Sequence, residues 1–126
     1  MKKPLLHPSE WEIMNVIWKL GKKTTVREVL ELIYPDGQKA YTTVQTIMNK
    51  LVDKGFLRRE KIGLVNFYAP KKSRMSSIGT ETKNFVKRVY NGSFISLANY
   101  LIASGSLSKE EMEELKQIMA ENQKEQ

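Results

Sequence analysis

The sequence predicts a mainly α-helical chain with one small β-hairpin, and three observations lead to this fold class. Apolar residues recur at three- and four-residue steps within residues 40–55, which places them on one face of a helix. Two β-rich runs follow at once, Phe56 to Lys61 and Leu64 to Ala69, around a turn at Ile62-Gly63. From residue 73 onward the helical spacing returns. A short hairpin between helical segments is the expected architecture.

The first two helices are predicted from caps and apolar stripes. Ser9 and Glu12 have capping-pair spacing, and Gly21 follows the end of the first helix. Thr25 and Glu28 form the same pair at the start of the second helix, which ends before Pro35. Both tryptophans are expected in the core. The apolar residues expected there are Trp11, Ile13, Met14, Ile17, Trp18, Val26, Val29, Leu30 and Ile33.

The third helix is expected to start near Tyr41 or Thr42, with Thr42 and Gln45 as a further capping pair, and to stop at Gly55. Its buried face would consist of Val44, Ile47, Met48, Leu51 and Val52. Three short helices and a hairpin in residues 1–72 are the parts of a winged helix-turn-helix domain.

Residues 73–126 are predicted to form a second, helical domain with three helices. Ser73 to Thr80 looks like a joint, Asn91-Gly92 breaks the first helix, and Ser93 and Ser108 cap the next two. About 54 residues cannot bury so many large apolar side chains in one chain. We therefore expect a helical dimerisation domain, with folding back onto residues 1–72 as the alternative. The dimer contacts are assigned to Phe85, Val89, Phe94, Leu97, Leu101, Leu115 and Ile118.

Composition excludes several kinds of site. The 126 residues include no cysteine and one histidine, His7, so the usual ligands of zinc or copper are lacking. No apolar run reaches the roughly 18 to 20 residues of a membrane span, and no signal peptide is visible. The carboxylates, among them Asp36 and Asp53, have no nucleophile, base or phosphate-binding loop beside them. We expect a cytoplasmic protein that is not an enzyme and that has no metal, no cofactor and no membrane insertion.

The positive charge is concentrated in the first part of the chain. Residues 1–72 hold 14 Lys and Arg against 7 Asp and Glu, a net charge of +7, whereas residues 73–126 hold 7 of each, a net charge of 0. This asymmetry favours a polyanionic partner for the first domain only. Lysines that merely keep a small protein soluble remain the alternative on composition alone.

The polar face of the third helix favours double-stranded DNA as that partner. A winged helix that binds protein should expose Leu, Phe or Met there, and this one shows short hydrogen-bonding side chains instead. Gln45 can offer its amide to adenine, while Thr42 and Thr46 can bond a base edge or pack against thymine, with an N-cap as the alternative for Thr42. The complete predicted DNA-binding set is Thr42, Thr43, Gln45, Thr46, Asn49, Lys50, Arg58, Arg59 and Lys61. Its cations and Thr43 are assigned to phosphates.

Several motifs together resemble the BlaI/MecI/CopY family of bacterial penicillinase repressors. They are residues 9–18 (SEWEIMNVIW), 43–47 (TVQTI), 51–55 (LVDKG), 83–86 (KNFV) and 89–92 (VYNG). The resemblance implies a dimeric transcriptional repressor on a palindromic operator. In the copper-sensing branch a C-terminal cysteine cluster binds the metal, and this chain has none.

The resemblance also implies release by a signal-activated protease, after a membrane receptor senses a β-lactam. The family is cut at an Asn-Phe bond in the helix after the Tyr-x-Gly turn. Alignment on that turn places Tyr100-Leu101 at the bond, with Asn99-Tyr100 one residue earlier. Ala40-Tyr41 and Thr42 differ from the Ser-Pro and lysine common in the family, so the resemblance does not carry the family's operator sequence over to this chain.

Overall fold

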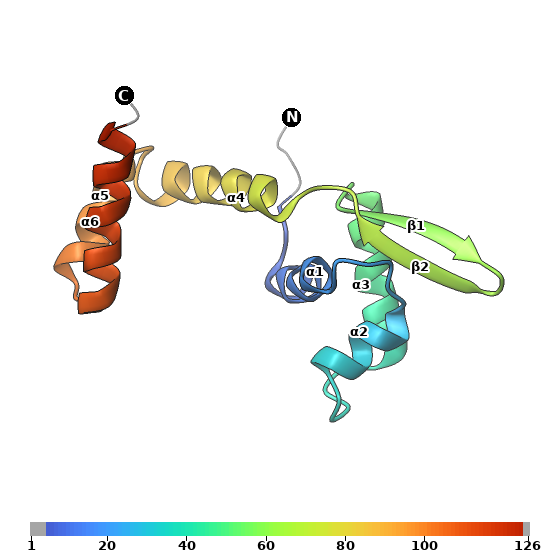
Figure 1. Cartoon of the computed structure of the whole chain (residues 1–126). Helices are drawn as coiled ribbons and strands as arrows, with labels where there is room; N and C mark the ends of the chain where they lie inside the picture. The colour runs from blue at the N-terminus through green and yellow to red at the C-terminus, as the bar shows by residue number, and fades with distance from the viewer. Residues whose placement is uncertain (1–4, 125–126) are drawn as a thin grey trace. The chain divides into compact units, whose positions relative to one another are not determined.

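The computed structural model describes residues 5–124 and is mostly helical with one antiparallel hairpin (Figure 1). The elements are α1 (Pro8–Leu20), α2 (Val26–Ile33), α3 (Tyr41–Asp53), β1 (Leu57–Ile62), β2 (Val65–Pro70), α4 (Arg74–Val89), α5 (Phe94–Ala103) and α6 (Lys109–Lys124). The predicted fold class, a winged helix-turn-helix followed by helices, is confirmed. The chain divides into two compact units, Met1–Glu81 and Thr82–Gln126, and the division falls within α4.

The N-cap of helix α1 lies two residues before the predicted one. His7 is the N-cap, and its backbone N–H donates to Glu10 Oε1 at 2.8 Å. Pro8 occupies the first helical position, where its missing N–H costs nothing because that group has no partner inside the helix. The predicted Ser9–Glu12 capping pair is therefore wrong. Gly21 ends the helix in the left-handed conformation with φ 63°, as predicted.

Two further caps show where sequence patterns succeed and fail. The Thr25 side chain accepts a hydrogen bond from the Glu28 backbone N–H at 3.2 Å, so this predicted cap is confirmed. Helix α3 instead starts after Ala40, whose side chain makes no capping bond. The predicted Thr42–Gln45 pair is wrong, because Thr42 already lies inside the helix.

The hairpin is shifted by one residue from its predicted position. Ile62 pairs with Val65, which makes Gly63-Leu64 the two-residue turn. Gly63 has φ 65°, and Leu64 is not among the described residues with positive φ. This is the pattern of a type II′ turn, which needs glycine at its first central position. In the predicted turn at Ile62-Gly63, Gly63 would have been the second central residue instead of the first.

A single bridge joins the connection between α1 and α2 to the hairpin. Thr24 and Tyr68 exchange backbone hydrogen bonds of 2.9 and 2.7 Å. Thr24 is fully buried, so the bridge lies in the interior of the first unit. It fixes the wing against the helical body, from which the hairpin projects (Figure 1).

The core of the first unit lies where α1, α2, α3 and the base of the hairpin meet. Helices α1, α2 and α3 each contact the other two, α3 contacts β1, and α1 contacts β2. Trp11 and Trp18 are half-buried at the edge of this core, with Trp18 Nε1–H donating to the Lys72 carbonyl at 3.0 Å. The buried residues are Leu6, Ile13, Met14, Ile17, Val26, Val29, Tyr34, Val44, Met48, Leu51, Phe56, Leu57 and Tyr68.

The remaining helices start and stop largely where predicted. Helix α4 already begins at Arg74, so the expected joint over residues 73–80 is helical, with Ser73 accepting from the Ser76 backbone N–H at 3.1 Å. Ser93 and Ser108 accept from the backbone N–H groups of Ser96 and Glu111 at 3.2 and 3.1 Å. Both predicted caps are confirmed. No helix between residues 5 and 124 combines the length and the apolar character that a membrane crossing requires.

Candidate nucleic-acid interface

Helix α3 presents a polar row to solvent because its apolar positions are buried. Val44, Met48 and Leu51 are fully buried, which fixes the rotation of the helix about its axis. The predicted DNA-binding residues on this helix therefore lie on the other side. Thr42, Thr43, Thr46 and Lys50 are exposed, and Gln45 and Asn49 are half-buried.

Two threonines of this row are joined to each other. Thr46 Oγ1 donates to the Thr42 backbone carbonyl at 2.9 Å, which is the usual bond of a threonine inside a helix. The hydroxyl proton of Thr46 is thereby used, and its oxygen lone pairs remain as acceptors. Because Thr42 is not a cap, its hydroxyl has no capping role in the helix.

Asn49 ties α3 to the wing. Its Oδ1 accepts a hydrogen bond from Arg59 at 2.8 Å and another from the Tyr68 hydroxyl at 2.8 Å. The side-chain oxygen thus uses both of its lone pairs, and the amide NH₂ group keeps two donors. The structure therefore brings Asn49 and Arg59 together as partners, whereas the sequence had placed them in separate roles.

The strand register separates the three wing cations. Arg59 pairs with Tyr68 and Lys61 with Asn66, and alternate residues share a face of a hairpin. Since Arg59 and Tyr68 both bond Asn49, this is the face turned toward α3. Arg58 lies on the opposite face. All three cations are exposed.

A groove of about 290 Å³ lies between the wing and the N-terminal parts of α2 and α3. Its lining is Thr25, Val26, Arg27, Tyr41, Gln45, Leu64, Val65, Asn66 and Tyr68. The Arg27 guanidinium lies 5.0 Å from the centre of the Tyr41 ring, which holds this cation at the groove. Neither Arg27 nor Asn66 was among the predicted site residues. Arg27 did carry a signal, because a cation in the first turn of a helix opposes the helix dipole.

Burial keeps the two core tyrosines protonated. Burial raises the pKa of Tyr68, and the Arg59 guanidinium opposes this rise only in part. Burial likewise raises the pKa of Tyr34 well above its usual range, and the Glu12 carboxylate adds to the rise. The Tyr68 hydroxyl is therefore a stable donor to Asn49 at neutral pH.

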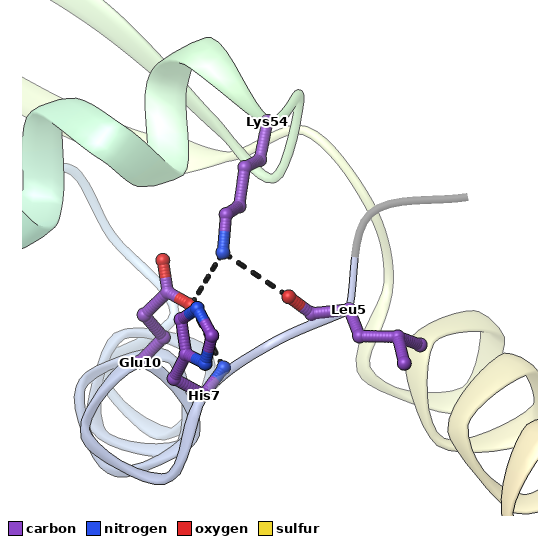
Figure 2. A network of polar contacts seen from close by, with 4 residues as sticks. All are labelled: Leu5, His7, Glu10 and Lys54. Carbon is purple, nitrogen blue, oxygen red and sulfur yellow. Dashed lines mark hydrogen bonds and ion pairs between the residues drawn. The ribbon is translucent and has the colours of Figure 1, made fainter. Parts of the chain in front are cut away.

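A buried ion pair holds the end of α3 against α1. Glu10 is 3% exposed, and its Oε1 accepts from Lys54 Nζ at 2.7 Å and from the His7 backbone N–H (Figure 2). Lys54 also donates to the Leu5 carbonyl at 3.1 Å. Figure 2 shows Lys54 reaching from the end of α3 toward both acceptors. No sequence pattern pointed to this network.

The predicted residues of the second unit fall into two groups by exposure. Phe85, Val89, Phe94 and Ile118 are exposed although they are large and apolar. Leu97, Leu101 and Leu115 are half-buried. The candidate cleavage residues Asn99 and Tyr100 are exposed within α5. Within the described part of the chain no three His, Cys, Asp or Glu side chains gather as metal ligands would.

Comparison with known proteins gives consistent matches. The family model of the penicillinase repressor matches residues 6–121. The penicillinase repressor of Bacillus licheniformis is 34% identical over 97% of this chain and 95% of its own length. The methicillin resistance regulatory protein MecI of Mammaliicoccus sciuri is 32% identical over 88% and 89%.

The chain is also similar to a solved structure. It is the solution structure of monomeric Bacillus licheniformis BlaI in complex with the blaP half-operator, with 32% identity and a TM-score of 0.48 over 58% of this chain and 88% of that one. The family model and the two relatives settle the classification, because each match spans most of this chain. The chain belongs to the penicillinase repressor family, whose members are repressors rather than enzymes.

Proposed function

We propose that this chain is a transcriptional repressor that binds a palindromic operator in double-stranded DNA as a homodimer. The observation that carries the proposal is the exposed polar row of α3 beside the cations of the wing. Short hydrogen-bonding side chains fit base edges in the major groove, and flanking cations fit phosphates. The Bacillus licheniformis relative, which is named a penicillinase repressor, supports the same interpretation.

Within this interface some side chains would contact base edges and others would contact phosphates. Gln45, Thr42 and Thr46 would contact base edges, since a glutamine amide matches adenine and a threonine methyl matches thymine. Lys50, Arg59 and Lys61 would neutralise phosphates, together with Thr43 at the start of α3. Arg58, on the outer face of the wing, would reach a phosphate from the other side.

Asn49 would act mainly by holding the wing against α3. Its Oδ1 is occupied by Arg59 and Tyr68, so only the amide donors remain for DNA. Adenine is read by a donor and an acceptor together, which Asn49 no longer offers. We therefore assign base reading to Gln45 and positioning to Asn49.

The dimer would form through the helices of the second unit. Large apolar side chains there remain in contact with water in the single chain, including Phe85, Val89, Phe94 and Ile118. Burial stabilises by roughly 25 cal/mol per Å² of apolar surface, so a second copy that covers these side chains is favoured. Twofold symmetry would match the two halves of a palindrome.

Release would follow a proteolytic cut within α5. The candidate bonds are Asn99-Tyr100 and Tyr100-Leu101, in the last part of a helix of 10 residues. The cut would separate Leu101 and all of α6 from the DNA-binding unit. A signal-activated protease, responding to a β-lactam type of signal, would be the partner in this step.

A footprint of the full chain on the DNA around its own gene tests the DNA-binding proposal. We expect two protected half-sites related by twofold symmetry. Their centres should be separated by about one helical turn of DNA or by a multiple of one turn. The matched control is a chain with Gln45 and Thr46 both changed to alanine, which keeps the buried face of α3. Protection without sequence preference, or no protection, would contradict the proposal.

A further inference from the structure

We propose that a cavity beside the first turns of α4 binds a small apolar amino acid as its zwitterion. The cavity has a volume of about 190 Å³, and all of its lining residues belong to the first unit. None of them is in the predicted DNA-binding set. The inference is therefore independent of the proposed DNA binding.

One part of the lining is apolar and aromatic. Leu6 and Phe56 are buried, with 7% and 5% of their surfaces exposed, and Trp11 is half-buried beside them. An apolar cavity of about 150 Å³ accepts one benzene molecule. A volume of about 190 Å³ therefore fits one ring or one branched aliphatic group, with a small polar group attached.

The part of the lining that comes from α4 is small or polar. Ser76, Thr80 and Glu81 line the cavity and are four and five positions apart, so they share one face of the helix. A helix face against apolar residues normally carries Leu, Ile or Val, because close packing excludes voids. Two hydroxyl side chains at these positions leave the space open. A ligand with both apolar and polar atoms would fill it.

Two opposite charges line the cavity without pairing with each other. Lys72 and Glu81 are both half-buried, and neither forms an ion pair with another residue between 5 and 124. Lys72 Nζ lies 4.4 Å from the centre of the Phe56 ring, which holds the ammonium group beside the apolar part of the lining. Partly buried charges are stabilised by partners of opposite sign. A zwitterion supplies both partners, a carboxylate for Lys72 and an ammonium for Glu81.

The same two charges disfavour a simple organic acid or amine. An acid would pair with Lys72 but leave Glu81 without a partner, and an amine would do the reverse. The Ser76 and Thr80 hydroxyls suit a zwitterion, because a hydroxyl can donate to a carboxylate and can accept from an ammonium. The apolar part of the lining then selects the side chain of the amino acid.

A bound ligand would join α4 to the body of the first unit. Leu6 precedes α1, Trp11 lies in α1 and Phe56 precedes β1, whereas the hydroxyl residues lie in α4. A ligand that contacts both parts stabilises the state in which they are together. The amides of residues 76–81 should therefore exchange with solvent more slowly when the ligand is bound.

The first experiment titrates the full chain with L-phenylalanine and follows NMR chemical shifts. The expected dissociation constant is about 1 mM or lower, from roughly 12 non-hydrogen atoms at the efficiency of an ordinary ligand. The compound 3-phenylpropionate lacks the ammonium group, and phenethylamine lacks the carboxylate. Each should bind about tenfold more weakly, because a hydrogen bond to a charged group is lost.

The second experiment changes the lining. Lys72→Gln should weaken binding of the two carboxylates about tenfold but not of phenethylamine, and Glu81→Gln should weaken binding of the two amines but not of 3-phenylpropionate. Lys71→Gln is the matched control, because Lys71 is exposed and lies outside the lining. Thr80→Leu should fill the cavity and abolish binding of all three compounds. Its urea midpoint should be equal or higher, since a filled cavity stabilises the fold.

Three results would overturn the inference. The first is that neither L-phenylalanine nor L-leucine shifts the resonances of residues 76–81 at concentrations far above the millimolar range. Equal affinity for L-phenylalanine and 3-phenylpropionate would mean that the ammonium group is not recognised. Unchanged binding to Thr80→Leu would place the ligand elsewhere on the chain. None of these measurements involves DNA, so they do not depend on the outcome of the footprint.

Discussion

Asn49 of α3 accepts a hydrogen bond from the buried hydroxyl of Tyr68 in β2 at 2.8 Å. The same oxygen accepts from Arg59 in β1, so one side chain on the proposed recognition helix contacts both strands of the wing. Tyr68 in turn bridges to Thr24 through its backbone. The relative position of helix and wing is therefore set by a short chain of hydrogen bonds that begins at Asn49.

We expect Asn49→Ala and Tyr68→Phe to have similar effects on DNA binding. Asn49→Ala removes both bonds between this side chain and the wing, and Tyr68→Phe removes the one from the tyrosine hydroxyl. Each should cost about 1 to 3 kcal/mol of folding free energy, since a polar group loses its partner. Tyr68 is buried and cannot touch DNA, so it is the matched control for positioning. Urea unfolding measures the loss of folding free energy. Titration with a DNA duplex that the full chain selects from a random pool, called the selected duplex below, measures the loss of affinity. A far larger loss for Asn49→Ala, confined to one base pair, would show that Asn49 reads a base.

Gln45→Ala and Lys61→Ala should separate base reading from phosphate binding. Gln45→Ala should cost about 1 to 3 kcal/mol on the selected duplex and relax specificity at one position. Lys61→Ala should weaken all sequences alike and reduce the salt slope by about one. Titrations on selected and scrambled duplexes at several salt concentrations measure both. Equal losses for Gln45→Ala on the two duplexes would exclude it as a base reader.

Local signals in the sequence were sufficient for most elements of this fold. Thr25 and Ser108 are predicted as caps because each has a glutamate three residues later, and Ser93 because it follows the break at Asn91-Gly92. All three cap their helices. Ser9 and Thr42 satisfy the same spacing but lie inside helices. The first of these helices begins at Pro8 and the second directly after Ala40. The capping pattern alone could not distinguish a residue at the cap from one inside the helix.

Contacts between distant residues could not be predicted from spacing. The Thr24–Tyr68 bridge joins residues in different elements, and the bonds of Asn49 depend on the register of the hairpin. A shift of one residue in that register exchanges the two faces of the wing. The sequence therefore identified the cations of the wing but could not show that Arg59 and Lys61 face α3 and that Arg58 does not.

Substitution of either partner of the Glu10–Lys54 ion pair should lower the folding free energy, by unequal amounts. Lys54→Met removes the cation and leaves the nearly inaccessible Glu10 carboxylate without it, whereas Glu10→Gln leaves Lys54, which is partly exposed to water. We expect Lys54→Met to lose about 2 to 4 kcal/mol of folding free energy and Glu10→Gln clearly less. Urea unfolding measures both, with Lys116→Met, from an exposed pair, as the control. A larger loss for Glu10→Gln would contradict this ordering.

The position of the domain boundary can be tested with two fragments. Residues 1–72 and 1–81 should both fold and remain monomeric, but 1–81 should be more stable. Residues 73–81 complete the lining of a cavity of about 190 Å³ beside Leu6 and Phe56, which are buried in the full chain. Their loss should cost about 1 to 2 kcal/mol through exposure of apolar surface. Urea unfolding and sedimentation measure stability and association.

Both fragments should bind the selected duplex more weakly than the full chain. Two half-sites would no longer be occupied by one linked molecule, and the gain from effective concentration would be lost. A dimer of residues 1–81 that binds with full affinity would place the dimer interface in the first unit.

The last prediction concerns the end of repression. A cut at Asn99-Tyr100 or Tyr100-Leu101 would remove Leu101, Ile102 and α6 from the rest of the chain. The remaining stump would lose much of the apolar area proposed for the dimer, so dimerisation should weaken by several kcal/mol, on the order of 25 cal/mol per Å² lost. DNA occupancy should then fall without any change in α3. Since a protease needs an extended substrate, the cut requires local opening of α5.

Cells given the inducing signal should therefore contain fragments ending near residue 100, detectable by mass spectrometry. The variant with Asn99 and Tyr100 both changed to alanine should stay intact and keep repressing. Asn84→Ala is the matched control, because it alters another Asn-aromatic bond of the chain, Asn84-Phe85, in α4. If this control blocks the cut instead, the cleavage site lies in α4. If induction proceeds with the chain intact, proteolysis is not the mechanism, and a ligand that acts on the intact dimer would have to replace it.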